Sequence, residues 1–330
     1  MNTFERFGGW RAPRSGVRTG RATWPRGLLV AGAAAAVLAS ALTGSAAQAA
    51  NHPDRATRRA SAATIGATKK PPDRIISLSP TATEMLFAIG AGRQVVAVDE
   101  DSDYPSDAPR TKLSGLEPNI EAIARYNPDL VVVSYDPEGF VKSLAALGVP
   151  VLLEPAATNL AGTYAQIEAL GRATGHAGQA AALVRRMRAE IAAAIAGAPR
   201  FSPPETYYFE LEQDFYSITS STYVGQLLKM FGLRDIADSA KGASSGYPQL
   251  SDEYIVKADP RIIFLADTIC CGQSARTVAA RPGWGNVAAV RDGAVVGLND
   301  DIASRWGPRV VDLARDIEAA LWRIKRHRGA

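Results

Sequence analysis

The side chains that most often carry out catalysis are few in this sequence and poorly placed for it. Of the three histidines, His52 lies near the amino terminus, His176 lies between two helical patterns and His327 lies close to the carboxyl terminus. A histidine-based nucleophilic triad or a histidine-rich zinc site needs at least one of them in a cleft. The histidines therefore argue against most hydrolase and zinc-enzyme chemistries.

Carboxylates are the remaining candidates for catalysis. Glu210, Glu212 and Asp214 follow one another at the end of a strand pattern. Alternation along a strand would place Glu210 and Glu212 on the same side, as a general acid and base pair requires. A solvated strand end produces the same pattern, so an exported carboxylate-dependent enzyme is kept as the alternative class of function.

The two cysteines are adjacent, at Cys270 and Cys271. In an oxidising compartment they can close into a vicinal disulfide that stiffens the loop after a strand at 262–266. Two reduced, merely structural thiols are the alternative. Metal ligation is a weaker interpretation, because one adjacent pair supplies too few soft ligands.

Aromatic side chains form the most informative set, because they fall where predicted strands end and loops begin. In open α/β sheets ligands bind at that edge. A packed loop aromatic is the alternative for any one of them, but together they predict an aromatic-lined cleft for a bulky ligand. The set comprises Tyr104, Tyr135, Phe215, Tyr216, Tyr247 and Trp306, and Arg305 stands beside it as a candidate partner for an anionic ligand.

An internal repeat predicts the elements that position these residues. Residues 121–133 read Glu, a short amphipathic segment, Asn-Pro and an aliphatic strand, and residues 253–265 repeat this order with Asp-Pro. Between the copies, residues 179–196 are rich in alanine and contain neither glycine nor proline, which favours one long helix. Two α/β lobes with mainly parallel sheets, bridged by one long helix, are therefore the predicted fold.

The predicted strands and boundaries follow from apolar runs separated by helical patterns. We expect strands at 75–79, 95–98, 130–134 and 149–153 in an N-terminal lobe spanning 74–160. A connector at 161–199 leads to a C-terminal lobe at 200–330, with strands at 206–211, 262–266 and 293–297.

The amino-terminal region has the pattern of an export signal. Six arginines precede an apolar run that ends at Leu42, and Ala47-Gln48-Ala49 resembles a small-residue cleavage site. We expect a cleaved signal peptide at 1–49, with an uncleaved anchor as the alternative, and a disordered spacer at 50–73. No cysteine lies near the cleavage site, so a lipoprotein is not indicated and a periplasmic or extracellular location is expected.

The charge of the chain argues against a nucleic-acid partner. The whole sequence carries a net charge of +4, but the excess of basic over acidic residues lies before residue 75, and residues 75–330 carry more acidic than basic side chains. The basic surface that phosphate contacts require is therefore missing from the predicted fold.

Several short motifs occur in order along residues 74–325. They are residues 74–84 (RIISLSPTATE), Ser102-Asp-Tyr-Pro105, Glu117-Pro-Asn-Ile-Glu121, Asn127-Pro-Asp-Leu-Val-Val-Val133, Tyr247-Pro-Gln-Leu-Ser-Asp-Glu253 and Gly307-Pro-Arg309. In combination they resemble the motifs of substrate-binding proteins of ABC importers for iron complexes and cobalamin, the helical-backbone periplasmic binding proteins.

The resemblance implies two Rossmann-like lobes bridged by a rigid helix that permits only modest closure. It implies that Tyr104 and Tyr247 touch the ligand and that Glu121 and Glu253, one on each lobe, dock onto arginines of the permease. Charge pairs of this kind fix register and speed encounter. Two helix-start glutamates favoured by the helix dipole are the alternative.

The sequence as a whole predicts a non-enzymatic receptor that delivers a metal complex to an ABC permease dimer. A ferric siderophore is the first choice of ligand, cobalamin the second and haem the third. No resident cofactor or metal is expected, and the protein is expected to act as a monomer.

Overall fold

The structure is a computed structural model that describes residues 70–137 and 139–329. The predicted signal peptide and residues 50–69 of the predicted spacer lie outside the described residues. Ordered contacts begin slightly before Arg74, because the carbonyl oxygen of Pro72 accepts a hydrogen bond from Gln94 and the backbone N–H of Asp73 donates to Asp129. All of the described residues belong to one compact unit.

The N-terminal lobe contains a five-stranded parallel sheet in the order β3-β2-β1-β4-β5. Aliphatic strands buried along their whole length form its centre, with Ile75 opposite Leu130 and Leu78 opposite Val133. The strands are β1 (Ile75–Leu78), β2 (Val95–Asp99), β3 (Arg110–Leu113), β4 (Leu130–Val133) and β5 (Val151–Leu153), and the helices between them are α2 (Pro80–Ala88), α3 (Ile120–Ala124) and α4 (Phe140–Ala146).

The C-terminal lobe repeats the plan with a four-stranded parallel sheet in the order β7-β6-β8-β9. In its centre Phe209 lies opposite Phe264. The strands are β6 (Thr206–Glu210), β7 (Arg234–Asp235), β8 (Ile262–Leu265) and β9 (Val295–Gly297), and the helices are α7 (Tyr223–Met230), α8 (Asp252–Ala258), α9 (Thr268–Cys271), α10 (Ala275–Ala279), α11 (Ala288–Arg291) and α12 (Asp300–Ser304).

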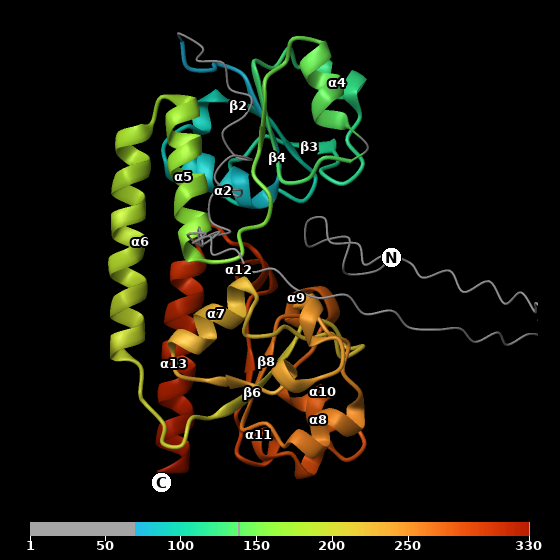
Figure 1. The fold of residues 1–330 in the computed structure, drawn as a ribbon, viewed down its shortest axis with the longest axis vertical. Helices are drawn as coiled ribbons and strands as arrows, with labels where there is room; N and C mark the ends of the chain where they lie inside the picture. Colours follow the sequence, from blue (N-terminus) through green and yellow to red (C-terminus); the bar gives the residue numbers. More distant parts are fainter. Residues whose placement is uncertain (1–69, 138, 330) are drawn as a thin grey trace, which may run out of the picture. The chain divides into compact units, whose positions relative to one another are not determined.

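Three long helices carry the connection between the two sheets (Figure 1): α5 (Leu160–Thr174), α6 (Ala177–Gly197) and the closing α13 (Val310–Arg328). Helix α6 packs against both α5 and α13. It buries Leu183, Met187 and Ile191 on one side. The predicted α/β fold with two mainly parallel sheets and one long bridging helix is confirmed.

The internal repeat extends to backbone conformation. Asn127 and Asp259 stand at equivalent points, directly before the proline that leads into β4 or β8, and they adopt nearly the same left-handed φ values of 47° and 46°. Asparagine and aspartate are the residues other than glycine that tolerate this region best. The two copies therefore match at the residue before the proline, although Asp259 is itself the C-cap of α8 and Asn127 lies two residues beyond the C-cap of α3.

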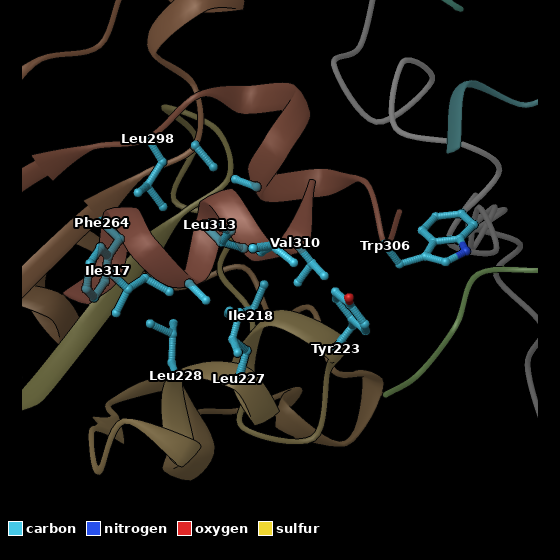
Figure 2. Packing of buried hydrophobic residues seen from close by; sticks show 14 of the residues in the cluster. Ile218, Tyr223, Leu227, Leu228, Phe264, Leu298, Trp306, Val310, Leu313 and Ile317 are labelled. Atoms are coloured by element: carbon cyan, nitrogen blue, oxygen red, sulfur yellow. The ribbon is translucent and has the colours of Figure 1, made fainter. Parts of the chain in front are cut away.

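The apolar face of α13 completes the core of the C-terminal lobe. Figure 2 shows Leu313 and Ile317 of this helix beside Leu227 and Leu228 of α7, with Phe264 of β8 next to Ile317. All five side chains are at most 1% exposed. This packing fixes the start of α13, whose N-cap residue is Arg309 of the candidate site.

Two short edge strands were not predicted. In β3 only Leu113 is buried, and β7 contains two residues, neither of them buried. Neither strand carries the apolar run that identified the other strands, because each of these two strands buries little of its surface.

Candidate functional site

The loop after β2 presents Tyr104 to solvent from a firmly held base. The buried hydroxyl of Thr83 hydrogen-bonds to those of Ser77 and Ser102, at 2.9 and 2.8 Å, which joins the loop to β1 and α2. Two residues farther on, Tyr104 is 48% exposed. Burial raises the pKa of Asp99, which ends β2 below this loop, to about 7.

A buried ion-pair network centred on Glu84 joins α2 to the segment before α13. Glu84 Oε1 accepts hydrogen bonds from Arg305 Nη1 at 3.1 Å and Arg309 Nη2 at 2.5 Å, while Oε2 accepts from Arg309 Nε at 2.9 Å. Arg305 also pairs with Asp103 and Asp301, each at 2.9 Å. Because these partners belong to both lobes, the network ties the lobes together.

The network leaves the two arginines with little charge to offer a ligand. The side chains of Arg305 and Arg309 are 11% and 14% exposed, and both contact the carboxylate of Glu84. The Arg309 guanidinium also lies 4.3 Å from the centroid of the Tyr104 ring, a cation-π contact. Arg305, predicted to meet an anionic ligand, is therefore held by three carboxylates.

A hollow of about 390 Å³ lies next to this network. Helices α2, α6 and α13 and the Tyr104 loop contribute its walls. Its lining includes Glu84, Phe87, Tyr104, Arg186, Met187 and Arg309.

The other N-terminal candidate, Tyr135, follows β4 and is 40% exposed. Trp306 differs from it, because only 8% of Trp306 is exposed and its indole N–H donates to Gln166 at 2.9 Å. Trp306 belongs to the same buried cluster as Val310 and Leu313, and Figure 2 shows its ring at one side of the view, beyond Val310. Trp306 thus joins α5 to the approach to α13, and little of its ring faces solvent.

The aromatic residues of the C-terminal lobe are more packed than those of the N-terminal lobe. Phe215 adopts a φ of 65° and stacks on Trp284 with ring centroids 5.8 Å apart. The backbone of Tyr216 forms a bridge with Gln249, and burial raises the pKa of Tyr247. Phe215, Tyr216 and Tyr247 are all half-buried.

The carboxylate of Glu210 is bound within the protein. It is fully buried and pairs with Arg281 through two hydrogen bonds of 2.6 Å, one to each oxygen. Nearby Asp267 is also buried, and the pKa of its carboxyl is raised to about 8 by burial and then by the charge of Glu210. A glutamate held in this way is poorly suited to transfer protons to a substrate, which weakens the carboxylate-enzyme alternative.

One further sequence pattern bears on that alternative. Residues 242–246 read Gly-Ala-Ser-Ser-Gly, which matches the Gly-x-Ser-x-Gly sequence motif that carries the nucleophilic serine of many hydrolases. The structure places Ala243–Ser245 in a single 3₁₀ turn that follows no strand. Since a nucleophile elbow requires a strand-turn-helix, this serine does not have the geometry of the motif.

The structure joins the sulfur atoms of Cys270 and Cys271 in a disulfide. Both residues belong to α9, which follows β8 after two residues. The buried carboxylate of Asp300 accepts hydrogen bonds from the backbone N–H groups of Thr268, Ile269 and Cys270 at 2.8–3.1 Å. This one side chain satisfies the free donors at the start of α9.

Glu121 and Glu253 occupy equivalent positions on the two lobes. Each is exposed in the first turn of a short helix, α3 or α8, whose first turn is capped by Asn119 or Ser251. The backbone and the Ser251 hydroxyl lower the pKa of Glu253. The structure thus presents one carboxylate from each lobe to solvent.

Within residues 70–137 and 139–329, no group of three or more histidine, cysteine, aspartate or glutamate side chains is arranged to hold a metal ion. In the same part of the chain no helix has the length and apolar character needed to cross a bilayer.

Sequence reasoning missed the pairing of Glu84 with two arginines and that of Glu210 with Arg281. A signal for the first existed, because Glu84 lies in a helix whose other buried residues are small or apolar. Glutamate is almost never fully buried without a partner. The identity of the partner, more than 200 residues away, had no local signal.

Comparison with known proteins places these features in a family. Residues 75–302 match the model of a family described as periplasmic binding protein. An uncharacterized ABC transporter substrate-binding lipoprotein, YvrC of Bacillus subtilis, is 28% identical over 263 residues, which cover 77% of this chain and 81% of the relative. A cobalamin-binding protein of Halobacterium salinarum is 32% identical over 251 residues, covering 73% of this chain and 67% of the relative.

A solved structure shows the same fold. The periplasmic vitamin B12 binding protein BtuF of Vibrio cholerae is 27% identical, with a TM-score of 0.62, and the match covers 77% of this chain and 98% of that structure.

Proposed function

Because the chain belongs to the periplasmic binding protein family, and is a substrate-binding protein of the ABC importer class that handles vitamin B12, haem and siderophore iron, we propose that its own ligand is a corrinoid. Relatives named for cobalamin or vitamin B12 support this ligand. The ferric siderophore favoured by the sequence motifs becomes the second candidate.

The observation that carries the proposal is the neutralisation of Arg305 and Arg309 by Glu84 together with Asp103 and Asp301. An anionic iron complex would have to compete with a buried carboxylate for these guanidiniums, and breaking buried ion pairs is costly. A corrinoid offers a large apolar and amide-bearing surface, which suits the exposed rings of Tyr104 and Tyr135.

Isothermal titration calorimetry with cyanocobalamin, a ferric hydroxamate and haemin tests the ligand. We expect cyanocobalamin to bind, and Tyr104→Ala and Tyr135→Ala each to weaken its binding about fivefold to tenfold, which corresponds to about 1–1.4 kcal/mol of lost ring contact. Trp322→Ala is the matched control, because Trp322 is 40% exposed near the end of α13. Binding of the ferric hydroxamate alone would refute the corrinoid and leave the importer role standing.

We further propose that the partner is an ABC permease dimer, engaged through Glu121 and Glu253. Their equivalent, exposed positions support one contact per lobe. Delivery by a monomer follows from this, since each lobe then meets one permease subunit.

Export through a cleaved signal peptide completes the proposal. The cysteines of the chain are at positions 270 and 271, so no cysteine near the proposed cleavage site would carry the lipid of a lipoprotein relative. Mass spectrometry of the mature protein, with an expected amino terminus near Ala50, checks this point.

A further inference from the structure

The turn formed by residues 268–273, here the disulfide turn, lies at the carboxyl end of β8. Strand β8 is central in its sheet, and Figure 1 shows α9 beyond its end. This edge of an open parallel sheet is where α/β folds bind ligands. None of the functions described above uses the disulfide turn.

The disulfide turn exposes one large apolar side chain, that of Ile269, to solvent. Ile269 is 66% exposed, although the preceding Ala266 and Asp267 are 3% and 0% exposed. Cys270 and Cys271 are half-buried. An isoleucine and two bonded sulfur atoms thus form a small apolar surface at the sheet edge.

The first half of the disulfide turn is rigidly anchored to the β9–α12 connection. Besides the three backbone N–H groups bound by Asp300, the Thr268 hydroxyl lies within hydrogen-bond distance of Asp300 Oδ1, at 2.9 Å, and of the Leu298 carbonyl oxygen, at 2.7 Å. Asp300 is itself 5% exposed. The backbone that presents Ile269 is therefore fixed before any ligand arrives.

The second half is anchored to the buried Glu210–Arg281 pair. Gln273 donates its backbone N–H to the Asp267 carbonyl oxygen at 3.2 Å, and its side-chain oxygen accepts from Arg281 Nη2 at 2.8 Å. Because Arg281 is held by both oxygens of Glu210, the disulfide turn is fixed at both ends. A preformed apolar contact loses little conformational entropy on binding.

We propose that Ile269 and the Cys270–Cys271 disulfide form an apolar contact for the periphery of the bound metal complex. This inference rests on the proposed function and adds a contact from the C-terminal lobe. The disulfide has a chemical reason in such a site, because free thiolates are soft ligands that attack or coordinate transition metals. Bonded to each other, the sulfurs supply polarizable apolar surface while leaving the metal centre of the cargo untouched.

The first test compares Ile269→Ser with Leu147→Ser by calorimetry against cyanocobalamin, the ferric hydroxamate and haemin. Leu147 is a matched control, because it is 60% exposed and follows α4 away from the disulfide turn. We expect Ile269→Ser to weaken binding of whichever complex the wild type binds by about fivefold to tenfold, from the loss of a partly buried aliphatic side chain. Leu147→Ser should change it less than about twofold.

The second test measures the rate at which dithiothreitol reduces the disulfide, with and without saturating ligand. One dithiothreitol thiolate attacks a cysteine sulfur and releases the other as a thiolate. The second thiol of the reagent then displaces the first cysteine, giving two protein thiols and one cyclic disulfide. A ligand that covers the disulfide turn should slow this reaction several-fold.

The outcomes separate the inference from the function on which it rests. If the wild type binds one of the three complexes, but Ile269→Ser matches Leu147→Ser and the ligand leaves the reduction rate unchanged, the inference is overturned and the receptor function stands. If the wild type binds none of the three complexes, both are overturned.

Discussion

Replacing Glu84 by glutamine tests the central ion-pair network. The substitution keeps the size of the side chain and removes its charge. Both carboxylate oxygens of Glu84 now accept hydrogen bonds from guanidinium groups of Arg305 or Arg309. In the variant one of those positions becomes an NH₂ group that faces a donor, so at least one hydrogen bond is replaced by a repulsive contact.

The expected cost follows from burial. The Glu84 side chain is 1% exposed, and its two partners are 11% and 14% exposed. Removing one partner of a buried ion pair costs about 3–5 kcal/mol, and the retained amide oxygen favours the lower value. We therefore expect Glu84→Gln to lower the free energy of unfolding by about 3 kcal/mol, or Tm by about 6–12 °C for a chain of this size.

Urea unfolding and thermal unfolding, followed by circular dichroism, measure the effect. Glu190→Gln is the matched control, since Glu190 lies 3.4 Å from Arg315 and is 33% exposed. Such a partly exposed pair contributes about 0–1 kcal/mol. Equal destabilisation by the two substitutions would show that the network does not hold the lobes together.

Other substitutions test the pH dependence of stability, the close packing at a buried glycine and the docking onto the permease. Burial raises the pKa of Asp99 to about 7, so between about pH 4 and pH 7 the folded chain binds more protons than the unfolded chain and the free energy of unfolding falls as pH rises. Because the pKa rises from 3.8 to about 7, Asp99→Asn should remove about 4 kcal/mol of this fall in the free energy of unfolding between about pH 4 and pH 7, as measured by urea unfolding at several pH values; an unchanged slope would contradict the assignment. Gly225→Ala should destabilise the protein by more than about 2 kcal/mol in urea unfolding, because a Cβ atom there would clash with the Thr219 carbonyl oxygen. The exposed helical Gly178 has open space around it, so its replacement by alanine should be neutral or slightly stabilising, and similar losses at both glycines would refute the steric argument. Glu121→Arg and Glu253→Arg should each reduce transport by about tenfold or more in reconstituted vesicles while calorimetry shows unchanged ligand affinity, because like charges across an interface are repulsive; unimpaired transport would exclude these docking points.

Local patterns predicted the parts of this fold that bury continuous apolar surface. Strands β1, β4, β6 and β8 and helix α6 have sequences whose composition alone favours their structure. Strand β3 was missed because three of its four residues are exposed or half-buried. The edge strands β5 and β9 were predicted because their residues are apolar, so a polar composition is what removed the signal from β3.

The candidate site was less predictable than the fold, because long-range partners determine what each side chain does. Arg305 directly follows α12 and has the charge to meet an anionic ligand, yet Glu84, 221 residues away in sequence, binds it. Trp306 has the aromatic ring expected of a ligand contact, but Gln166 takes its N–H and the ring is largely buried. By contrast, Tyr104 and Tyr135 keep their exposure, as strand-end reasoning implied.

The continuity of α6 has a consequence for how a transporter senses that its receptor is loaded. The helix runs from Ala177 to Gly197 without a proline, and Glu84 adds a second tie between the lobes. These two connections resist a wide opening and closing of the lobes, so ligand binding cannot be signalled by a large change in the shape of the protein. The permease must then detect bound ligand through small local changes at the surface of the two lobes, or through direct contact with the ligand itself.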